Sequence, residues 1–142
     1  MAGTITSCGV IADVGLSIAG RAQETISGGQ FVKVMSGAGI TATTSTMTDK
    51  IEFALADAAG DIPLAIGMAI NNATSGNDVT VQLEGIVRAT AGGAMSPGTR
   101  VSVPVGTDAT AVDDAAAVGS GIGWGLTAAG SGEYVLVKLG KS

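Results

Sequence analysis

The charged side chains that could take part in chemistry are twelve Asp and Glu and seven Lys and Arg. The chain has no histidine and a single cysteine, Cys8. Histidine is the usual general base near neutral pH, so its absence excludes Ser-His-Asp and Cys-His arrangements within the chain. A single cysteine also excludes an intrachain disulfide and a thiolate zinc site, and is typical of a small buried apolar residue.

The carboxylates do not predict a catalytic pair. Most of the candidate acids lie next to expected turns, where solvated Asp and Glu are common: Asp57, Asp61, Asp78, Glu84, Asp113, Asp114 and Glu133. Asp108, Asp113 and Asp114 could offer oxygen ligands to calcium, but they lack the alternating ligands and terminal Glu of a calcium loop. We therefore expect no enzymatic activity, no bound metal and no cofactor.

Composition restricts the classes of partner. The 142 residues carry a net charge of −5, and the seven Lys and Arg residues are spread singly along the chain. Proteins that bind nucleic acid neutralise phosphates with clustered basic residues, so we expect no nucleic-acid contact. No apolar run reaches the ~20 residues of a membrane helix, and the N-terminus lacks the basic region and apolar run of a secretory signal. We expect no membrane contact and synthesis in a reducing cytosol.

A repeated stretch organises the predicted fold. Residues Ile66–Gly85 (IGMAINNATSGNDVTVQLEG) return as Ile122–Gly140 (IGWGLTAAGSGEYVLVKLG) at a constant spacing. Each copy reads as a strand, a tight Ser-Gly turn and a second strand that alternates apolar and polar residues. Val79, Val81 and Leu83 match Val135, Val137 and Leu139, and we expect them to face the core. The pattern predicts a duplicated β-hairpin.

Alternation and turn signals predict more strands, at Gln30–Ser36, Lys50–Ala56, Thr99–Val105 and Thr110–Val112. The longest β segment, Val79–Thr90, is interrupted at Gly85, where a register change would let it serve two parts of a closed sheet. Pro104 indicates an edge strand. The fold class is therefore all-β, a small barrel or sandwich of about eight to ten short strands with little helix.

We expect one β domain over residues 21–142, preceded by an N-terminal arm or edge segment over residues 1–20. That segment is apolar, rich in small residues and interrupted by glycines. The candidate partner contacts in it are Thr4, Ile5, Val10, Ile11, Val14 and Leu16. Trp124, the only tryptophan, is a candidate interface anchor. Packing in the core near Met68 is the other role for its side chain, and the sequence slightly favours it.

Three motifs between about Pro63 and Leu139 carry a family resemblance: VTVQLEGIVRAT, GTRVSV and SGEYVLVKL. In these motifs the chain resembles the small capsid decoration, or cement, proteins of tailed viruses, the bacteriophages. The resemblance implies a homotrimer, made in the host cytoplasm, that binds the outside of an icosahedral capsid and stabilises the lattice of the major capsid protein. A tail, fibre or spike module of a virion is the main alternative, and a ligand-binding β domain is a weaker one.

Overall fold

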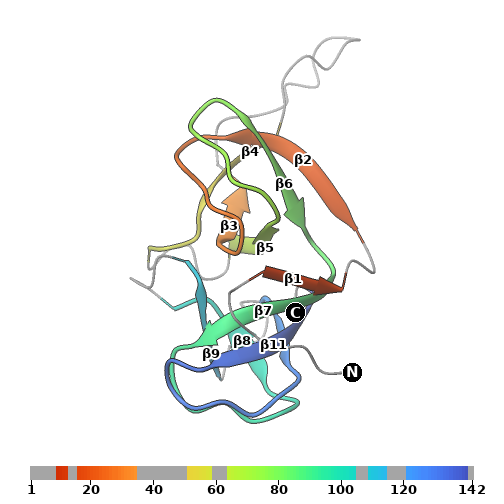
Figure 1. Ribbon diagram of the computed structural model, residues 1–142, viewed down its shortest axis with the longest axis vertical. Coiled ribbons are helices and arrows are strands. Elements are labelled where there is room, and N and C mark those ends of the chain that lie inside the picture. The colour runs from red at the N-terminus through yellow and green to blue at the C-terminus, as the bar shows by residue number, and fades with distance from the viewer. Residues whose placement is uncertain are drawn as a thin grey trace.

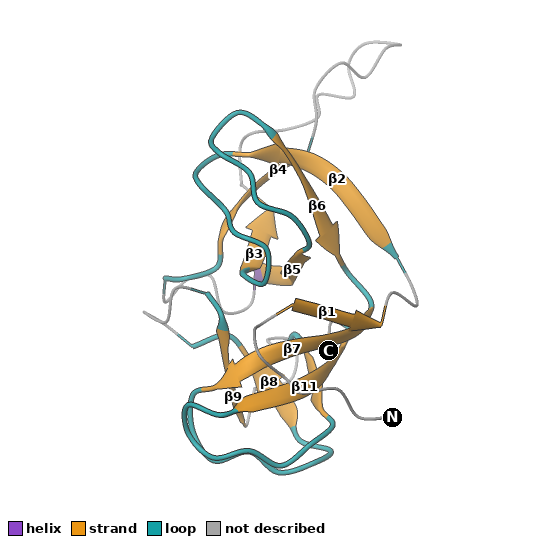
Figure 2. Ribbon diagram, viewed as in Figure 1, coloured by secondary structure: helices purple, strands orange, loops and turns teal. Residues whose placement is uncertain are grey.

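A computed structural model of the protein describes residues 9–12, 16–34, 51–58, 64–104, 109–114 and 121–140. These residues form short strands joined by loops, with almost no helix (Figure 2). The strands are β1 (Gly9–Ala12), β2 (Ser17–Ala22), β3 (Phe31–Val34), β4 (Glu52–Leu55), β5 (Ala65–Ala69), β6 (Asp78–Gln82), β7 (Gly85–Ala91), β8 (Arg100–Ser102), β9 (Ala111–Asp114), β10 (Gly123–Gly125) and β11 (Tyr134–Leu139).

The strands close into two five-stranded barrels that lie one above the other (Figure 1). The first barrel has the order β2-β4-β3-β5-β6, and the second has the order β7-β11-β10-β8-β9. Each is closed by one parallel pair, β2 with β4 and β7 with β9, while the other neighbours within each barrel are antiparallel. Strand β1 pairs antiparallel with β7. The predicted all-β class is confirmed.

The duplication covers a whole barrel rather than one hairpin. The predicted hairpin is present twice, as β5 with β6 and as β10 with β11. An isolated bridge joins Ile26 to Ala73 in the first barrel, and Met95 to Ala129 at the same place in the second. Each barrel therefore repeats the strand order, the parallel closure and the bridge of the other.

Glycines hold two features of both barrels in place. The predicted Ser-Gly turns are formed, and Gly76 and Gly132 have φ values of 88° and 83°, which L-residues rarely adopt. A Cβ atom at Gly67 would meet the Gln82 carbonyl oxygen, and one at Gly123 would meet that of Lys138. Both barrels thus use the same glycines for the turn and for the close approach of neighbouring strands.

Small and β-branched residues fill two buried cores. The first barrel encloses Phe53 and a set of smaller side chains: Ala22, Ile26, Val32, Ala69, Ala73, Val79 and Val81. The larger cluster contains the interior of the second barrel, including Val87, Val101, Val112, Val135, Val137 and Leu139. Phe31 and Met68 of the first barrel belong to this larger cluster, so apolar packing continues from one barrel to the other.

Two predictions about strand ends have different outcomes. The interruption at Gly85 is confirmed, because β6 ends at Gln82 and β7 begins at Gly85, which has a φ of 122°. The two parts belong to different barrels. The edge position inferred from Pro104 is wrong, since β8 pairs with both β10 and β9. Pro104 follows the end of β8 and therefore removes no hydrogen bond from that strand.

Candidate partner-binding surfaces

Trp124 lies on the outer face of the second barrel. Its β10 position pairs with Arg100 of β8 on one side and with Lys138 of β11 on the other. The flanking residues Gly123 and Gly125 are buried, whereas Trp124 is half-buried and outside the buried core clusters. The Lys138 ammonium is 5.9 Å from the centre of the indole ring. At this distance the cation is attracted to the electron-rich ring face.

The outer side of β11 extends this surface. Val135, Val137 and Leu139 are buried, so the alternation of the strand turns Tyr134, Leu136 and Lys138 outward. Leu136 pairs with Arg88 of β7, and the Arg88 guanidinium carbon is 5.9 Å from the centre of the Tyr134 ring. Aromatic, aliphatic and cationic groups thus alternate across neighbouring strands.

Leu126 continues the same face beyond β10. Its backbone N–H donates to the Leu136 carbonyl oxygen over 2.7 Å, and its side chain is 41% exposed. We call the whole surface the basic aromatic face, and it consists of Arg88, Arg100, Trp124, Leu126, Tyr134, Leu136 and Lys138.

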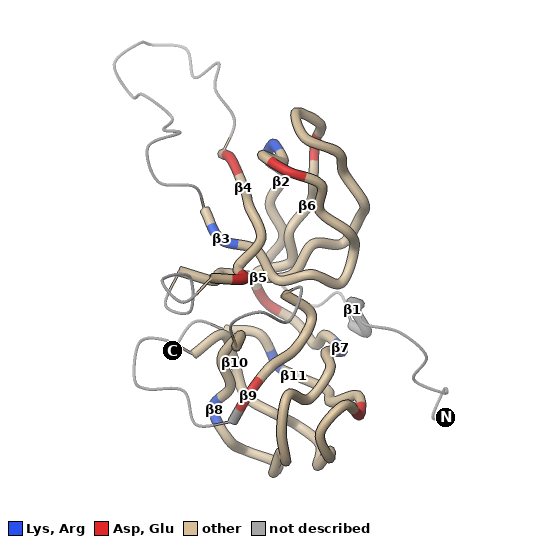
Figure 3. The backbone as a smooth tube through the Cα atoms, turned by 90° about the vertical axis from the view of Figure 1, so that its left-hand side faces the viewer, with Lys and Arg blue, Asp and Glu red and all other residues tan. Residues whose placement is uncertain are grey.

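Arg100 and Lys138 lie on the strands on either side of Trp124, and Arg88 lies on β7, beyond β11, although the sequence spreads these residues singly. Figure 3 shows these cationic positions on β7, β8 and β11 of the second barrel. The Nε atom of Arg100 is buried and has no hydrogen-bond partner within the described ranges. Sequence reasoning named Trp124 and missed the cations around it. The sequence offered one signal for Lys138. Side chains alternate along the predicted strand Tyr134–Leu139, so its buried valines imply that Lys138 points outward.

The corresponding face of the first barrel is closed. Met68 pairs with Phe31 on one side and with Gln82 on the other. In the second barrel Trp124 pairs in the same way with Arg100 and with Lys138. Phe31, Met68 and Gln82 are fully buried. The Phe31 N–H donates to the carbonyl oxygen of Ala109 over 2.6 Å, a contact between the barrels. The first barrel therefore uses this face to pack against the second.

The predicted arm residues are placed only in part. Thr4, Ile5 and Val14 lie outside the described residues, while Val10 and Ile11 belong to β1. Leu16 is 53% exposed, and its carbonyl oxygen accepts hydrogen bonds from the N–H groups of Leu83 and Glu84. The boundary predicted between residues 20 and 21 falls inside β2. Contact of this segment with a partner stays a prediction.

A shallow apolar pocket lies beside Leu16. It has a volume of about 280 Å³ and is lined by Leu16, Ile66, Leu83, Glu84 and Gly140. A Cβ atom at Gly140 would be 3.5 Å from the Trp124 ring, so this pocket adjoins the indole. It therefore places apolar surface and one carboxylate next to the basic aromatic face.

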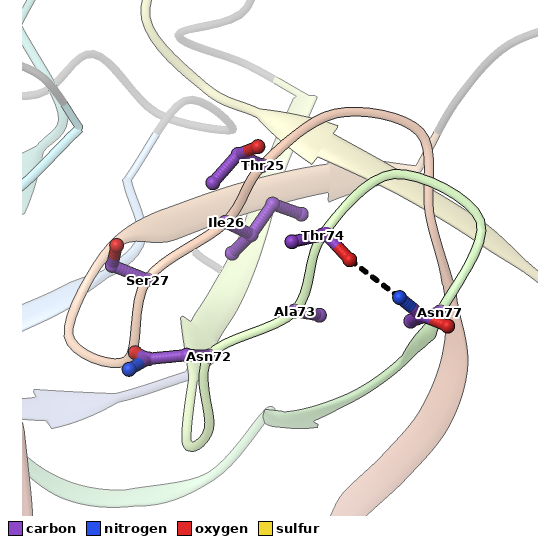
Figure 4. A pocket seen from close by; sticks show the side chains of 7 residues that line it. All are labelled: Thr25, Ile26, Ser27, Asn72, Ala73, Thr74 and Asn77. Atoms are coloured by element: carbon purple, nitrogen blue, oxygen red, sulfur yellow. Dashed lines mark hydrogen bonds between the residues drawn. The ribbon is translucent and has the colours of Figure 1, made fainter.

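A second, polar pocket lies at the bridge of the first barrel (Figure 4). Its volume is about 420 Å³, and its lining is Thr25, Ile26, Ser27, Asn72, Ala73, Thr74 and Asn77. The Asn77 amide donates to the Thr74 hydroxyl, and the Asn72 side-chain oxygen accepts from the Gly28 N–H. The lining offers hydroxyl and amide groups for hydrogen bonding, and none of its side chains is an acid or a base.

Two of the described acids have partners close to them in the fold. Glu133 accepts a hydrogen bond from the Gly130 N–H over 2.7 Å within its own turn, and Glu52 forms an ion pair with Arg21. No group of three or more His, Cys, Asp or Glu side chains that could hold a metal occurs in the described part of the chain. Asp61 and Asp108 lie outside it. Among the same residues, no helix has the length and apolar character needed to cross a membrane.

Comparison with known proteins gives a match to solved structures, but none to a family model or to a curated sequence. The fold is similar to that of the head fiber gp8.5 N base in bacteriophage phi29, with a TM-score of 0.60. The alignment covers 89% of this chain and 95% of that one, at 17% sequence identity. The two proteins share the double-barrel fold over nearly their whole lengths.

Proposed function

We propose that this chain is a virion structural protein that binds the outside of an icosahedral capsid and stabilises the lattice of the major capsid protein. The observation that carries the proposal is the fold shared with a phage head fiber base over 89% of the chain. The decoration-protein motifs between Pro63 and Leu139 support it independently, because they were read from the sequence alone.

The surface chemistry supports a binding role rather than catalysis. The polar pocket offers hydroxyl and amide groups, and the pocket beside Leu16 contains a single carboxylate. The half-buried Trp124, by contrast, is flanked by Arg100 and Lys138 on an outer face. Trp, Tyr and Arg are the residues most enriched at the energetic centres of protein interfaces. Such a protein acts by covering and holding other protein.

Assembly would multiply the strength of each contact. A homotrimer on the capsid exterior presents three copies of one surface, so a modest individual affinity is raised by avidity. An interface of ~800 Å² per partner is sufficient for a specific contact. Light scattering of the free protein tests this part, with a trimer as the expected mass and a monomer at all concentrations as the contrary result.

A capsid-binding assay tests the main proposal. Capsids from a virus lacking this gene are mixed with purified protein, sedimented and analysed for bound copies. We expect saturable binding with a fixed number of copies per capsid and a higher temperature of capsid disruption. Absence of the protein from sedimented capsids would contradict the proposal.

A head fibre base is the second candidate, and the same structural match favours it. A decoration protein and a fibre base would both attach to the head, but a fibre base also holds a projecting shaft. Electron microscopy of intact virions separates the two candidates. Low, compact density on the shell supports decoration, whereas density at the foot of a projecting fibre supports the second candidate.

A further inference from the structure

We infer that the basic aromatic face is the surface that docks on the capsid, against a protein surface presenting Asp and Glu carboxylates around an apolar centre. This inference rests on the proposed function and names the face that performs it. The two barrels have the same strand order, so their corresponding faces can be compared position by position.

The first barrel supplies a precedent for docking through this face. Phe31, Met68 and Gln82 occupy the positions of Arg100, Trp124 and Lys138 and are fully buried, and Phe31 and Met68 pack in the cluster that includes the interior of the second barrel. The same strand pairs thus already form a protein interface inside the molecule. In the second barrel these positions are only half-buried or exposed, so among the described residues nothing closes this face completely.

The composition of the face differs from that of a purely solvated surface. Trp124 and Leu136 are half-buried, and Leu126 and Tyr134 are large apolar side chains that remain exposed. Aromatic residues and Arg are enriched at interface cores, whereas Lys is favoured elsewhere on protein surfaces. The apolar residues therefore form the centre of the contact, and Lys138 belongs to its rim.

Charge selects the partner. The chain carries −5 overall, yet Arg100 and Lys138 flank Trp124 and Arg88 lies on the strand beyond β11, with Glu84 beside Lys138 as the one carboxylate in the adjoining pockets. A face of the opposite sign to the rest of the protein steers association with an acidic surface and disfavours a basic one. The face therefore fits an acidic partner that also offers apolar area for Trp124 and Leu126.

Equivalent leucine and isoleucine positions provide a matched test. Leu126 and Ile70 follow β10 and β5, are each 41% exposed, and donate their N–H groups to Leu136 and Thr80 of the paired strand. Only Leu126 lies on the basic aromatic face. Binding of the full chain to capsids lacking it is measured by sedimentation for the wild type, Leu126→Ser and Ile70→Ser.

We expect Leu126→Ser to weaken binding about tenfold, or about 1.4 kcal/mol, because it replaces apolar contact area beside Trp124 with a polar group. We expect Ile70→Ser to stay within about twofold of the wild type. A second pair isolates charge, because Lys138→Gln and Gln23→Glu each lower the net charge by one. Lys138→Gln should reduce both the affinity and its dependence on salt, and Gln23→Glu should leave both unchanged.

Two failures are distinguishable. If the wild type does not bind capsids, both the proposed function and this inference are overturned. If the wild type binds and Leu126→Ser binds equally well, the inference alone is overturned. Acetylation footprinting of the wild-type protein needs no variant, and it should show slower modification of Lys138 on capsids than in solution. Equal rates would likewise overturn the inference.

Discussion

In the first barrel the outer face of β3 and β5 is closed by Phe31 and Met68, whereas in the second the same positions carry Arg100 and Trp124. The backbone arrangement is duplicated, but this one face has diverged. Where the face packs within the molecule, its residues are apolar or neutral and fully buried. Where it faces outward, aromatic rings lie beside cations. A repeated fold can thus separate stability from recognition by changing a few positions.

The largest expected loss of stability comes from a substitution on the face of the first barrel that packs against the second barrel. Phe31→Ala should lower the free energy of unfolding by about 3–5 kcal/mol, because it leaves a cavity between the barrels. Arg100→Ala, at the equivalent position, should change it by no more than about 0.5 kcal/mol. Urea denaturation followed by circular dichroism measures both. Equal losses would show that the two faces do not differ in the way we describe.

The next largest loss of stability is expected at a strand glycine that both barrels have at the same position. Gly67→Ala and Gly123→Ala would each force a Cβ atom against a backbone carbonyl oxygen of the neighbouring strand. Each should cost roughly 2–3 kcal/mol of unfolding free energy, as overpacking does. Gly93→Ala is the control, since its nearest neighbour would be a side-chain oxygen 4.0 Å away. A tolerated alanine at either strand glycine would contradict the close approach.

A smaller loss of stability is expected at the two hairpin turns, and it should be the same for both. Gly76→Ala and Gly132→Ala place an L-residue at positive φ with open space around it, so backbone strain alone should cost about 1 kcal/mol each. Thermal unfolding of both variants gives the comparison. A difference between them greater than the cost itself would mean that the turns are not equivalent.

The smallest effect concerns an ion pair beside the parallel strand pair that closes the first barrel. Arg21 forms an ion pair with Glu52 over 3.6 Å, and the Arg21 side chain is 43% exposed. Its counterpart beside the parallel closure of the second barrel is Thr90. Arg21→Gln should cost less than about 0.5 kcal/mol, because water and salt screen exposed ion pairs. A larger loss at high salt would indicate a structural role that the exposure does not suggest.

Local pattern was sufficient to predict much of the fold. Alternation placed β11 at Tyr134–Leu139 with the correct residues buried, and Gly85 marked a real interruption. The duplication of the first three strands of each barrel was not predicted, because these strands share few residue types. Phe31 and Arg100 occupy one structural position but differ in size, charge and burial.

The candidate surface was predicted less well. Of the two roles predicted for Trp124, core packing near Met68 was slightly favoured over that of an interface anchor. The structure puts Trp124 at the position equivalent to Met68, but on an outer, half-buried face and outside the buried core clusters. Arg100 and Lys138 flank Trp124, and Arg88 lies one strand further on, only because the strand order β8-β10-β11-β7 differs from the sequence order. Such convergence depends on long-range pairing, which composition and periodicity do not encode.

The most direct measurement is a cryo-electron microscopy reconstruction of capsids saturated with this protein. Our account predicts that β10 and β11 of the second barrel lie against the shell, with Trp124 and Leu126 buried in the contact and capsid carboxylates near Arg100 and Lys138. A reconstruction in which this face is open to solvent, while another surface contacts the shell, would contradict it.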